Sequence, residues 1–240
     1  MRGLVGLVLG MATALVATGC GDDGIDRNPG GGSGGTGASS TGGTAGTSAG
    51  GTGGTGGSVT PPPPPDSCAP PIDEVDVSSP DAVVGTGASC TEAELDAALS
   101  GGGIIVFDCG TSATIVVTSP KVITQTTVIY GGGEITLSGG DATRIFLIDS
   151  DADLTVQNIT LADARVSGPR GDGPGPDNSG AAVYRHGSSA LHVINSTFRD
   201  NHASPAGADI GGGAIYSYGG DTVIVGSTFD GNTASGGGAI

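Results

Sequence analysis

Aromatic and basic residues are scarce in this chain. Its 240 residues include no tryptophan, four tyrosines, four phenylalanines and a single lysine, Lys121. Rings on which a sugar could stack are therefore few. The formal net charge is −16, from 8 basic and 24 acidic residues, which makes nucleic acid and anionic lipid poor partners because both are polyanions. An acidic surface instead keeps an exported protein soluble or binds divalent cations.

Long hydrophobic runs are missing beyond the N-terminus, so the sequence predicts no transmembrane helix. The N-terminus has the pattern of a signal peptide, in which Arg2 precedes an apolar run from Leu4 to Val16 and then Ala17-Thr18-Gly19-Cys20. The small residues before the cysteine resemble the lipobox of bacterial lipoproteins. This resemblance implies removal of residues 1–19 and acylation, as by palmitate, of Cys20. The product would be stably anchored in the cell envelope, at the outer membrane or the cell surface. An ordinary secretory signal is the alternative.

The segment that follows the signal peptide is of low complexity. Residues 20–65 are almost entirely Gly, Ser and Thr and end in five prolines, a composition that cannot bury enough apolar surface to offset its ordering entropy. We therefore expect a disordered tether that reaches roughly 35 to 40 Å. Residues 66–240 remain for a single domain with a core, of which residues 66–103 form an N-terminal cap.

Cysteine is also rare, with four residues in the chain. Apart from Cys20 these are Cys68, Cys90 and Cys109, an odd number for an exported protein. A disulfide between Cys90 and Cys109 would close a loop of about 20 residues and stabilise the fold by about 3 kcal/mol. Pairing of Cys68 with either residue is the alternative, because connectivity cannot be deduced from sequence. No cysteine pair has metal-ligand spacing.

The ordered region begins with one helix and continues as short strands. Thr91-Glu92-Ala93-Glu94 has the form of a capping box, and Leu95, Ala98 and Leu99 fall on one face, which predicts a helix over 91–100. Short β-rich runs bounded by Gly, Asp or Ser follow. We expect strands at 104–107, 114–118, 126–130, 134–137, 144–148 and 154–161.

Two motifs then repeat in phase. The sequence FxxN occurs at Phe198–Asn201 and Phe229–Asn232, and each copy is followed by GGAI, at residues 212–215 and 237–240. A repeat of 25 to 35 residues without a second helix must stack on its neighbours to bury its apolar side. We therefore expect parallel coils in which Phe198 lies over Phe229 and Asn201 over Asn232. Asn201 and Asn232 would form an asparagine ladder at a left-handed turn. The chain stops inside its last repeat, from which we expect a truncated stack.

These residues resemble two related groups of proteins. The stretch from Gly101 to Leu161 is similar to the N-terminal coils of the pectin-lyase-like superfamily, in which an amphipathic helix covers the first coil. The GGAI and FxxN motifs resemble the repeats of polymorphic outer-membrane proteins. The resemblance implies an all-β fold, a right-handed parallel β-helix (solenoid) over 104–240 with a short N-terminal capping helix. It also implies a surface-exposed, adhesin-like function.

Two insertions carry most of the mixed charge. Residues 162–179 and 202–210 each lie between an FxxN-like position and the next GGAI, so we expect them on one side of the stack, as walls of a cleft. The catalytic candidates are Asp163, Arg165 and Arg170 in the first insertion and Asp200, which occupies the position equivalent to Asp163 in the next repeat. Stacked aspartates with an arginine suit calcium-assisted β-elimination or glycoside hydrolysis. The alternative is solvated loop charges paired across coils.

A second acidic group is Asp149-Ser-Asp151-Ala-Asp153, which alternates carboxylates as calcium loops do. It fails as an EF-hand because Leu154 replaces the turn glycine and Thr160 the bidentate glutamate. A turn between strands is therefore favoured over a calcium site, and no other cofactor is indicated. The sequence as a whole favours a binding or structural module that meets an extracellular polysaccharide or a cell-surface partner. The alternative is a pectate-lyase-like polysaccharide lyase or glycoside hydrolase acting on an acidic polysaccharide.

Overall fold

The computed structural model describes residues 14–16, 70–148, 151–168, 175–205, 207 and 210–240. The chain divides into two units, Thr18–Ala69 and the remainder, and all described residues belong to the second. Cys20 and Cys68 therefore lie outside the described residues.

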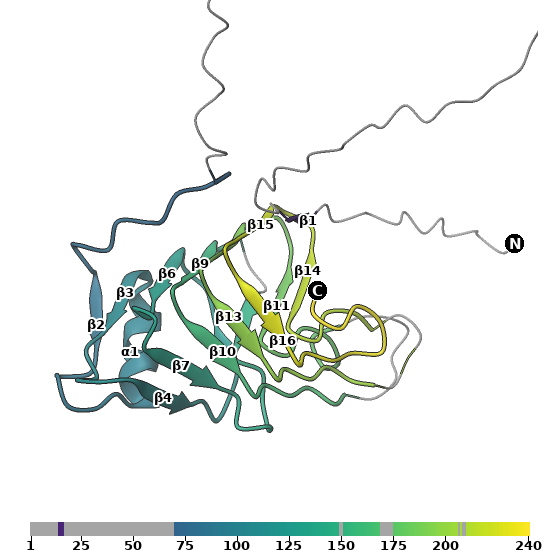
Figure 1. Ribbon diagram of the computed structural model, residues 1–240, viewed down its shortest axis with the longest axis horizontal. Coiled ribbons are helices and arrows are strands. Elements are labelled where there is room, and N and C mark those ends of the chain that lie inside the picture. The colour runs from purple at the N-terminus through teal and green to yellow at the C-terminus, as the bar shows by residue number, and fades with distance from the viewer. Residues whose placement is uncertain (1–13, 17–69, 149–150, 169–174, 206, 208–209) are drawn as a thin grey trace, which may run out of the picture. The chain divides into compact units, whose positions relative to one another are not determined.

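The described residues form three sheets and one helix, α1 (Glu92–Gly101), and every strand pairing is parallel (Figure 1). Sheet A has the order β1 (Ala14–Val16), β15 (Thr222–Val225), β12 (Leu191–Ile194), β9 (Leu154–Gln157), β6 (Thr127–Tyr130), β3 (Gly103–Phe107) and β2 (Ala82–Val84). Sheet B has the order β16 (Thr228–Asp230), β13 (Thr197–Arg199), β10 (Thr160–Ala162), β7 (Ile135–Ser138) and β4 (Ala113–Val116). Sheet C has the order β14 (Ile215–Tyr218), β11 (Val183–His186), β8 (Phe146–Ile148) and β5 (Lys121–Val122).

From β3 onward the chain visits the three sheets in turn. Strands β3, β4 and β5 lie in sheets A, B and C, and β6 then returns to sheet A beside β3. We call such a set of three consecutive strands a repeat. The prediction of an all-β fold built from parallel strands with one short helix is thus confirmed.

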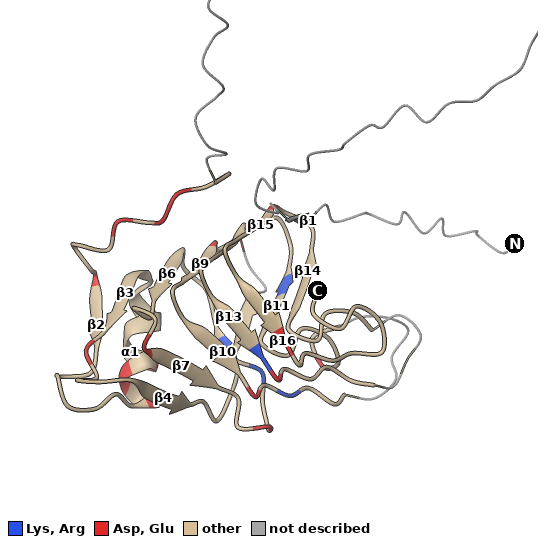
Figure 2. Ribbon diagram, viewed as in Figure 1, with Lys and Arg blue, Asp and Glu red and all other residues tan. Residues whose placement is uncertain are grey.

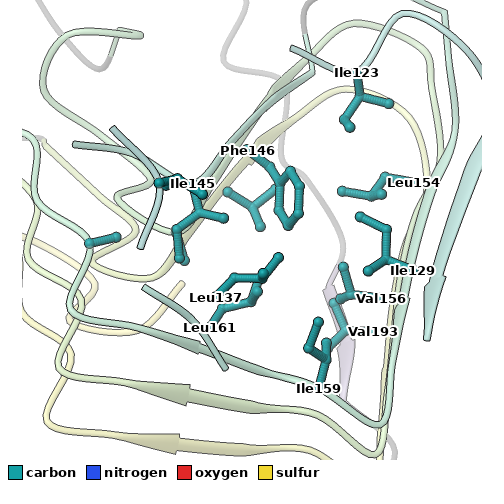
Figure 3. Packing of buried hydrophobic residues seen from close by; sticks show 14 of the residues in the cluster. Ile123, Ile129, Leu137, Ile145, Phe146, Leu154, Val156, Ile159, Leu161 and Val193 are labelled. Carbon is teal, nitrogen blue, oxygen red and sulfur yellow. The ribbon is translucent and has the colours of Figure 1, made fainter. Parts of the chain in front are cut away.

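The core lies between the three sheets. Ile129, Val156 and Val193 of sheet A point toward Leu137 and Leu161 of sheet B (Figure 3). Equivalent residues of successive repeats pair in register, so like packs on like. Burying one such aliphatic side chain is worth about 1.5 to 3 kcal/mol, and a repeat gains this only when a neighbour covers it.

The turn between sheets A and B corrects one expected strand. The run 154–161 was predicted as one strand, but it forms β9 and β10, which are separated at Asn158. Asn158 and the equivalent Asn195 have left-handed backbones, with φ of 51° and 47°. Asparagine tolerates this conformation better than most residues. The bend turns the chain from one sheet to the next within two residues.

Asn201 bonds Asn232 as the predicted asparagine ladder requires, but Asn201 is not the left-handed residue of its turn. Asn201 is fully buried, and the left-handed residue of that turn is its neighbour Asp200, with φ of 53°. The Asn201 amide donates to Asn232 Oδ1 at 2.9 Å and to the Leu161 carbonyl at 3.0 Å, and its Oδ1 accepts from Ala164 N–H at 3.1 Å. A buried amide so fully bonded links three repeats from inside rather than capping a turn.

The GGAI motif follows from backbone geometry. Its first glycine, Gly212 or Gly237, and the equivalent Gly180 of the related segment Gly180-Ala-Ala-Val have φ between 58° and 67°. A Cβ there would overlap the carbonyl oxygen three residues later, that of Ile215 in the case of Gly212. Only glycine fits this corner, where the chain enters sheet C.

Helix α1 is anchored at its N-terminus and beside it. The capping box is present: Thr91 Oγ1 accepts from Glu94 N–H at 3.3 Å, and Glu94 Oε2 accepts from Thr91 N–H at 2.9 Å. The predicted disulfide between Cys90 and Cys109 is confirmed, and it ties the start of the helix to the end of β3. No helix among the described residues has the length and hydrophobicity needed to cross a membrane.

Candidate functional site

Most of the aromatic side chains that face away from the core lie on sheet C. In β11, Val183 belongs to the core cluster and the next residue, Tyr184, does not. Side chains alternate between the two faces of a strand, so Tyr184 and His186 point outward. The register pairs Tyr184 with Tyr216 and His186 with Tyr218 of β14. We call these four residues the aromatic strip.

Each pair in the aromatic strip is stacked. The ring centroids of Tyr184 and Tyr216 are 5.2 Å apart with planes 13° from parallel, and those of His186 and Tyr218 are 5.2 Å apart at 12°. Exposure rises across the strip, since Tyr184 is buried, Tyr216 is half-buried, and His186 and Tyr218 are exposed. Burial, with a smaller effect of Tyr218, raises the pKa of Tyr216. The two exposed rings, His186 and Tyr218, cover one face of each other; each keeps its other face and a polar edge, the imidazole nitrogens of His186 and the hydroxyl group of Tyr218.

Arg144 fixes the inner end of the aromatic strip. It is buried, its guanidinium lies 5.2 Å from the ring centre of Tyr184, and it donates to the carbonyl oxygens of Ser179 at 2.6 Å and Gly180 at 2.9 Å. Burial lowers the pKa of Arg144 to about 10, against the opposing effects of Tyr184 and Asp177. Because both hydrogen bonds go to backbone carbonyls, they hold the Arg144 guanidinium in place against the Tyr184 ring.

A hollow of about 240 Å³ lies near the buried end of the aromatic strip. Its lining includes Arg144, Arg165 and Asp177, with the remainder from residues 120, 142–143, 166–167 and 176. The hollow therefore separates the first insertion from the preceding repeat. A larger hollow of about 560 Å³ is lined by residues 107–112, 131–132 and 134–135 beside the disulfide, and none of these residues is basic.

The described parts of the two insertions contact each other directly. Val166 N–H donates to the His202 carbonyl and Ser204 N–H to the Asn178 carbonyl, both at 3.0 Å. Ser204 Oγ also donates to the Gly168 carbonyl at 3.3 Å. They do lie on the same side of the stack, as expected, but their described parts form one layer.

The structure brings Asp163 and Asp200 together around a residue that the sequence did not single out. Arg199 Nη1 lies 3.2 Å from Asp200 Oδ2 and 3.8 Å from Asp163 Oδ1. Both aspartates occupy left-handed turn positions, with φ of 51° and 53°. Arg165 bonds Asp141 at 2.9 Å. These contacts match the alternative of loop charges paired across repeats, and Figure 2 shows the basic residues near β10, β11 and β13.

The remaining candidates are part of turns or fall outside the described residues. Arg170 and Asp149 lie outside them. Asp151 accepts from Ser188 Oγ at 3.1 Å, and Asp153 Oδ1 accepts from Ala190 N–H at 2.6 Å, so both tie the turn after β8 to the next repeat. Within the part of the chain that the structure describes, no three His, Cys, Asp or Glu side chains are grouped to hold a metal.

The aromatic ladder of sheet B lies where the repeat alignment puts it. Phe198 and Phe229 stack with centroids 4.8 Å apart and planes 11° from parallel. The aromatic strip was not predicted from the sequence, although Gly180–Tyr184 aligns with Gly212–Tyr216, which puts Tyr184 and Tyr216 in one column. The period of two residues within a strand would have placed His186 and Tyr218 beside them.

Comparison with known proteins gives no relative. No family model matches the sequence, and neither a curated protein nor a solved structure is significantly similar to it. The function therefore has to be inferred from the chain's own geometry.

Proposed function

We propose that this protein is a surface-exposed binding module of the bacterial cell envelope, and that its aromatic strip holds an extracellular or cell-surface polysaccharide. The observation that carries the proposal is the two pairs of stacked rings on the outward face of sheet C, Tyr184 with Tyr216 and His186 with Tyr218. A ring face is apolar and a phenol edge is polar, which matches the C–H faces and hydroxyl edges of sugars. Because the strip crosses two repeats, an extended chain can lie along it.

The proposed architecture is a right-handed parallel β-helix of the pectin-lyase-like type. Its support is the order of strands, since each return to a sheet adds a parallel strand beside the previous one. Connections between parallel strands of one sheet are right-handed in about 98% of proteins. Helix α1 would cover the first repeat, as the capping helix does in that superfamily.

The proposed location rests on the N-terminal sequence. The apolar run 4–16 followed by Ala17-Thr18-Gly19-Cys20 suits a lipoprotein signal, and the Gly-rich segment 20–65 suits a tether between the lipid and the sheets. A tether lets the binding face approach a ligand beyond the membrane surface.

The charge of the protein favours a neutral polysaccharide over an acidic one. With a net charge of −16, the protein repels polyanions at low ionic strength. The described cations near the strip are occupied, since Arg144 bonds two carbonyls and Arg165 bonds Asp141.

A lyase or hydrolase acting on an acidic polysaccharide is the competing function. It needs an arginine free to accept a proton, or two carboxylates free to act on a sugar. Arg165 instead bonds Asp141, and Asp163 and Asp200 lie against Arg199. The observed pairing favours binding without turnover.

The test is binding to a panel of soluble neutral and acidic polysaccharides, measured by affinity electrophoresis. We expect retardation by a neutral polymer, and a loss of affinity of about 2- to 10-fold in Tyr218→Ala, because one aromatic stack is worth about 0.5 to 1.5 kcal/mol. Tyr130→Ala removes the same side chain from β6 in sheet A and should bind as the unchanged protein does.

Two results would contradict the proposal. One is equal retardation of the Tyr218→Ala and unchanged proteins by every polymer that binds. The other is release of unsaturated products from pectate with calcium, which would establish the lyase instead.

A further inference from the structure

The segment that joins the linker to the first sheet, residues 70–80, lies along sheet A. We call it the arm; in Figure 1 it is the blue segment that runs above β6 and β9 before it enters β2. Its apolar side chains Ile72, Val75 and Val77 are half-buried, whereas Asp73, Glu74 and Asp76 are exposed. This pattern places one apolar edge of the arm against the protein.

Gln157 holds the backbone of the arm. Its Oε1 accepts from Val75 N–H at 2.8 Å, and its Nε2 donates to the Val75 carbonyl at 3.2 Å. The Gln157 side chain points outward from β9 yet is only 1% exposed, so the arm covers it. A carboxamide that satisfies both backbone groups of one residue replaces the pairing that a neighbouring strand would supply.

Glu74 is held by two equivalent asparagines. Its Oε1 accepts from Asn158 Nδ2 at 3.2 Å and from Asn195 Nδ2 at 2.5 Å. These asparagines occupy the same left-handed turn in neighbouring repeats, so their amides point to one place. The Glu74 carboxylate is thus bound by two neutral amide donors and by no cation. Because the two amides belong to neighbouring repeats, the contact bridges these repeats.

The arm is attached through side chains rather than through the sheet ladder. Among the described residues from Pro70 onward, the first backbone hydrogen bond to the sheets comes directly after the arm, from Asp81 N–H to the Ile104 carbonyl at 2.8 Å. The arm can therefore leave as a unit without breaking a ladder bond, with Pro80 next to the hinge. Its other end is Pro70, the first described residue after the segment 17–69.

We propose that the surface formed by Gln157, Asn158, Ile194 and Asn195 is a docking site for an extended acidic–apolar segment, and that the arm of a second copy of this chain occupies it. Ile194 completes the surface because it points outward beside Gln157 in the register yet is only 3% exposed. The segment that fits is the chain's own, and exchange of an identical element is a low-cost route to association. The contact is small, so exchange links copies held close together and is weak in dilute solution.

The experiment traps exchanged arms by disulfide formation in the full chain, with Cys20→Ser and Cys68→Ser in every sample. Glu74→Cys in one chain is mixed with Asn195→Cys in another and oxidised at high protein concentration. We expect a crosslinked dimer in several-fold excess over either variant alone, and a crosslink within one chain when both substitutions share it. The matched control replaces Asn195→Cys by Asp230→Cys, which is exposed on sheet B and reports random collision.

Two outcomes overturn the proposal. If the doubly substituted chain crosslinks internally but the mixture gives no more dimer than the Asp230→Cys control, the arm does not exchange. If the doubly substituted chain fails to crosslink, the surface does not hold the arm. Neither outcome depends on polysaccharide binding, so this test and that of the aromatic strip fail separately.

Discussion

At the residue scale, the one lysine of the chain has a structural role that its scarcity did not reveal. Lys121 is 4% exposed, and its Nζ lies 2.6 Å from Glu92 and 2.7 Å from Asp96 of helix α1. Burial alone would lower the pKa of Lys121, but the two carboxylates outweigh it and raise that pKa. The hydrogen bond from Lys121 lowers the pKa of Glu92 to about 2, with help from Thr118 and against burial. Lys121 therefore fastens α1 to sheet C.

This ion pair predicts an acid-sensitive stability. A carboxyl group whose pKa is lowered by folding stabilises the protein above its unfolded pKa, and this contribution is lost as the pH falls from about 4.5 toward 2. Lys121→Met should lower the free energy of unfolding at pH 7 by about 1 to 3 kcal/mol, because a charged hydrogen-bonded group is removed beside α1. It should also flatten the dependence of stability on pH below 4.5. Urea unfolding at pH 7, 4 and 3 measures both effects.

Arg199→Met is the control for Lys121→Met. Arg199 and its partner Asp200 are 45% and 50% exposed, and exposed pairs contribute only about 0 to 1 kcal/mol. If Lys121→Met and Arg199→Met lower the free energy of unfolding at pH 7 equally, Lys121 contributes no more than an exposed ion pair does.

At the element scale, the repeats were predictable and the turns were not. Phe198 over Phe229, and Val183 beside Ile215, follow from aligning the sequence with itself, because stacking places like residues in register. The break at Asn158 could not be deduced from hydrophobicity, since core residues lie before and after it, at Val156 and Ile159. Its cause is a backbone conformation that asparagine tolerates. The ion pairs around Arg199 were missed because aligning the repeats shows which residues are equivalent but not the direction in which their side chains point.

The first glycine of the GGAI motif should be sensitive to substitution. Gly212 has φ of 67°, and a Cβ would overlap the Ile215 carbonyl oxygen. Gly212→Ala should therefore lower the free energy of unfolding by about 3 kcal/mol, the sum of left-handed strain and a backbone shift. Gly133 also has a left-handed backbone, with φ of 77°, but a Cβ there meets nothing within 4 Å. Gly133→Ala should cost only about 1 kcal/mol, and thermal unfolding of the two variants should differ accordingly. Equal melting temperatures would contradict this account of the motif.

At the scale of the whole molecule, each repeat of the described residues pairs with the repeats next to it in the three sheets. Where repeats contact only their neighbours, stability is close to a sum of repeat and interface contributions. The arm departs from this rule because it joins β2 at one end and reaches the turns of β9 and β12 at the other. The segment Thr18–Ala69 belongs to a separate unit, so changes within it should leave the stack unaffected.

The proposed lipid anchor can be tested at Cys20, which belongs to a different unit from the sheets. Cys20→Ser should abolish incorporation of labelled palmitate, because the thiol that would carry the diacylglycerol is gone, and several acyl chains are needed for a stable anchor. The unfolding transition of the sheets should remain unchanged, since Cys20 and the core belong to different units. Cys68→Ser removes the other cysteine of the N-terminal segment and should leave labelling intact. Labelling that persists in Cys20→Ser, with the chain still retained on membranes, would show that another feature holds it there. Loss of labelling in both variants would show that labelling needs Cys68 as well as Cys20, and would contradict Cys20 as the sole lipid site.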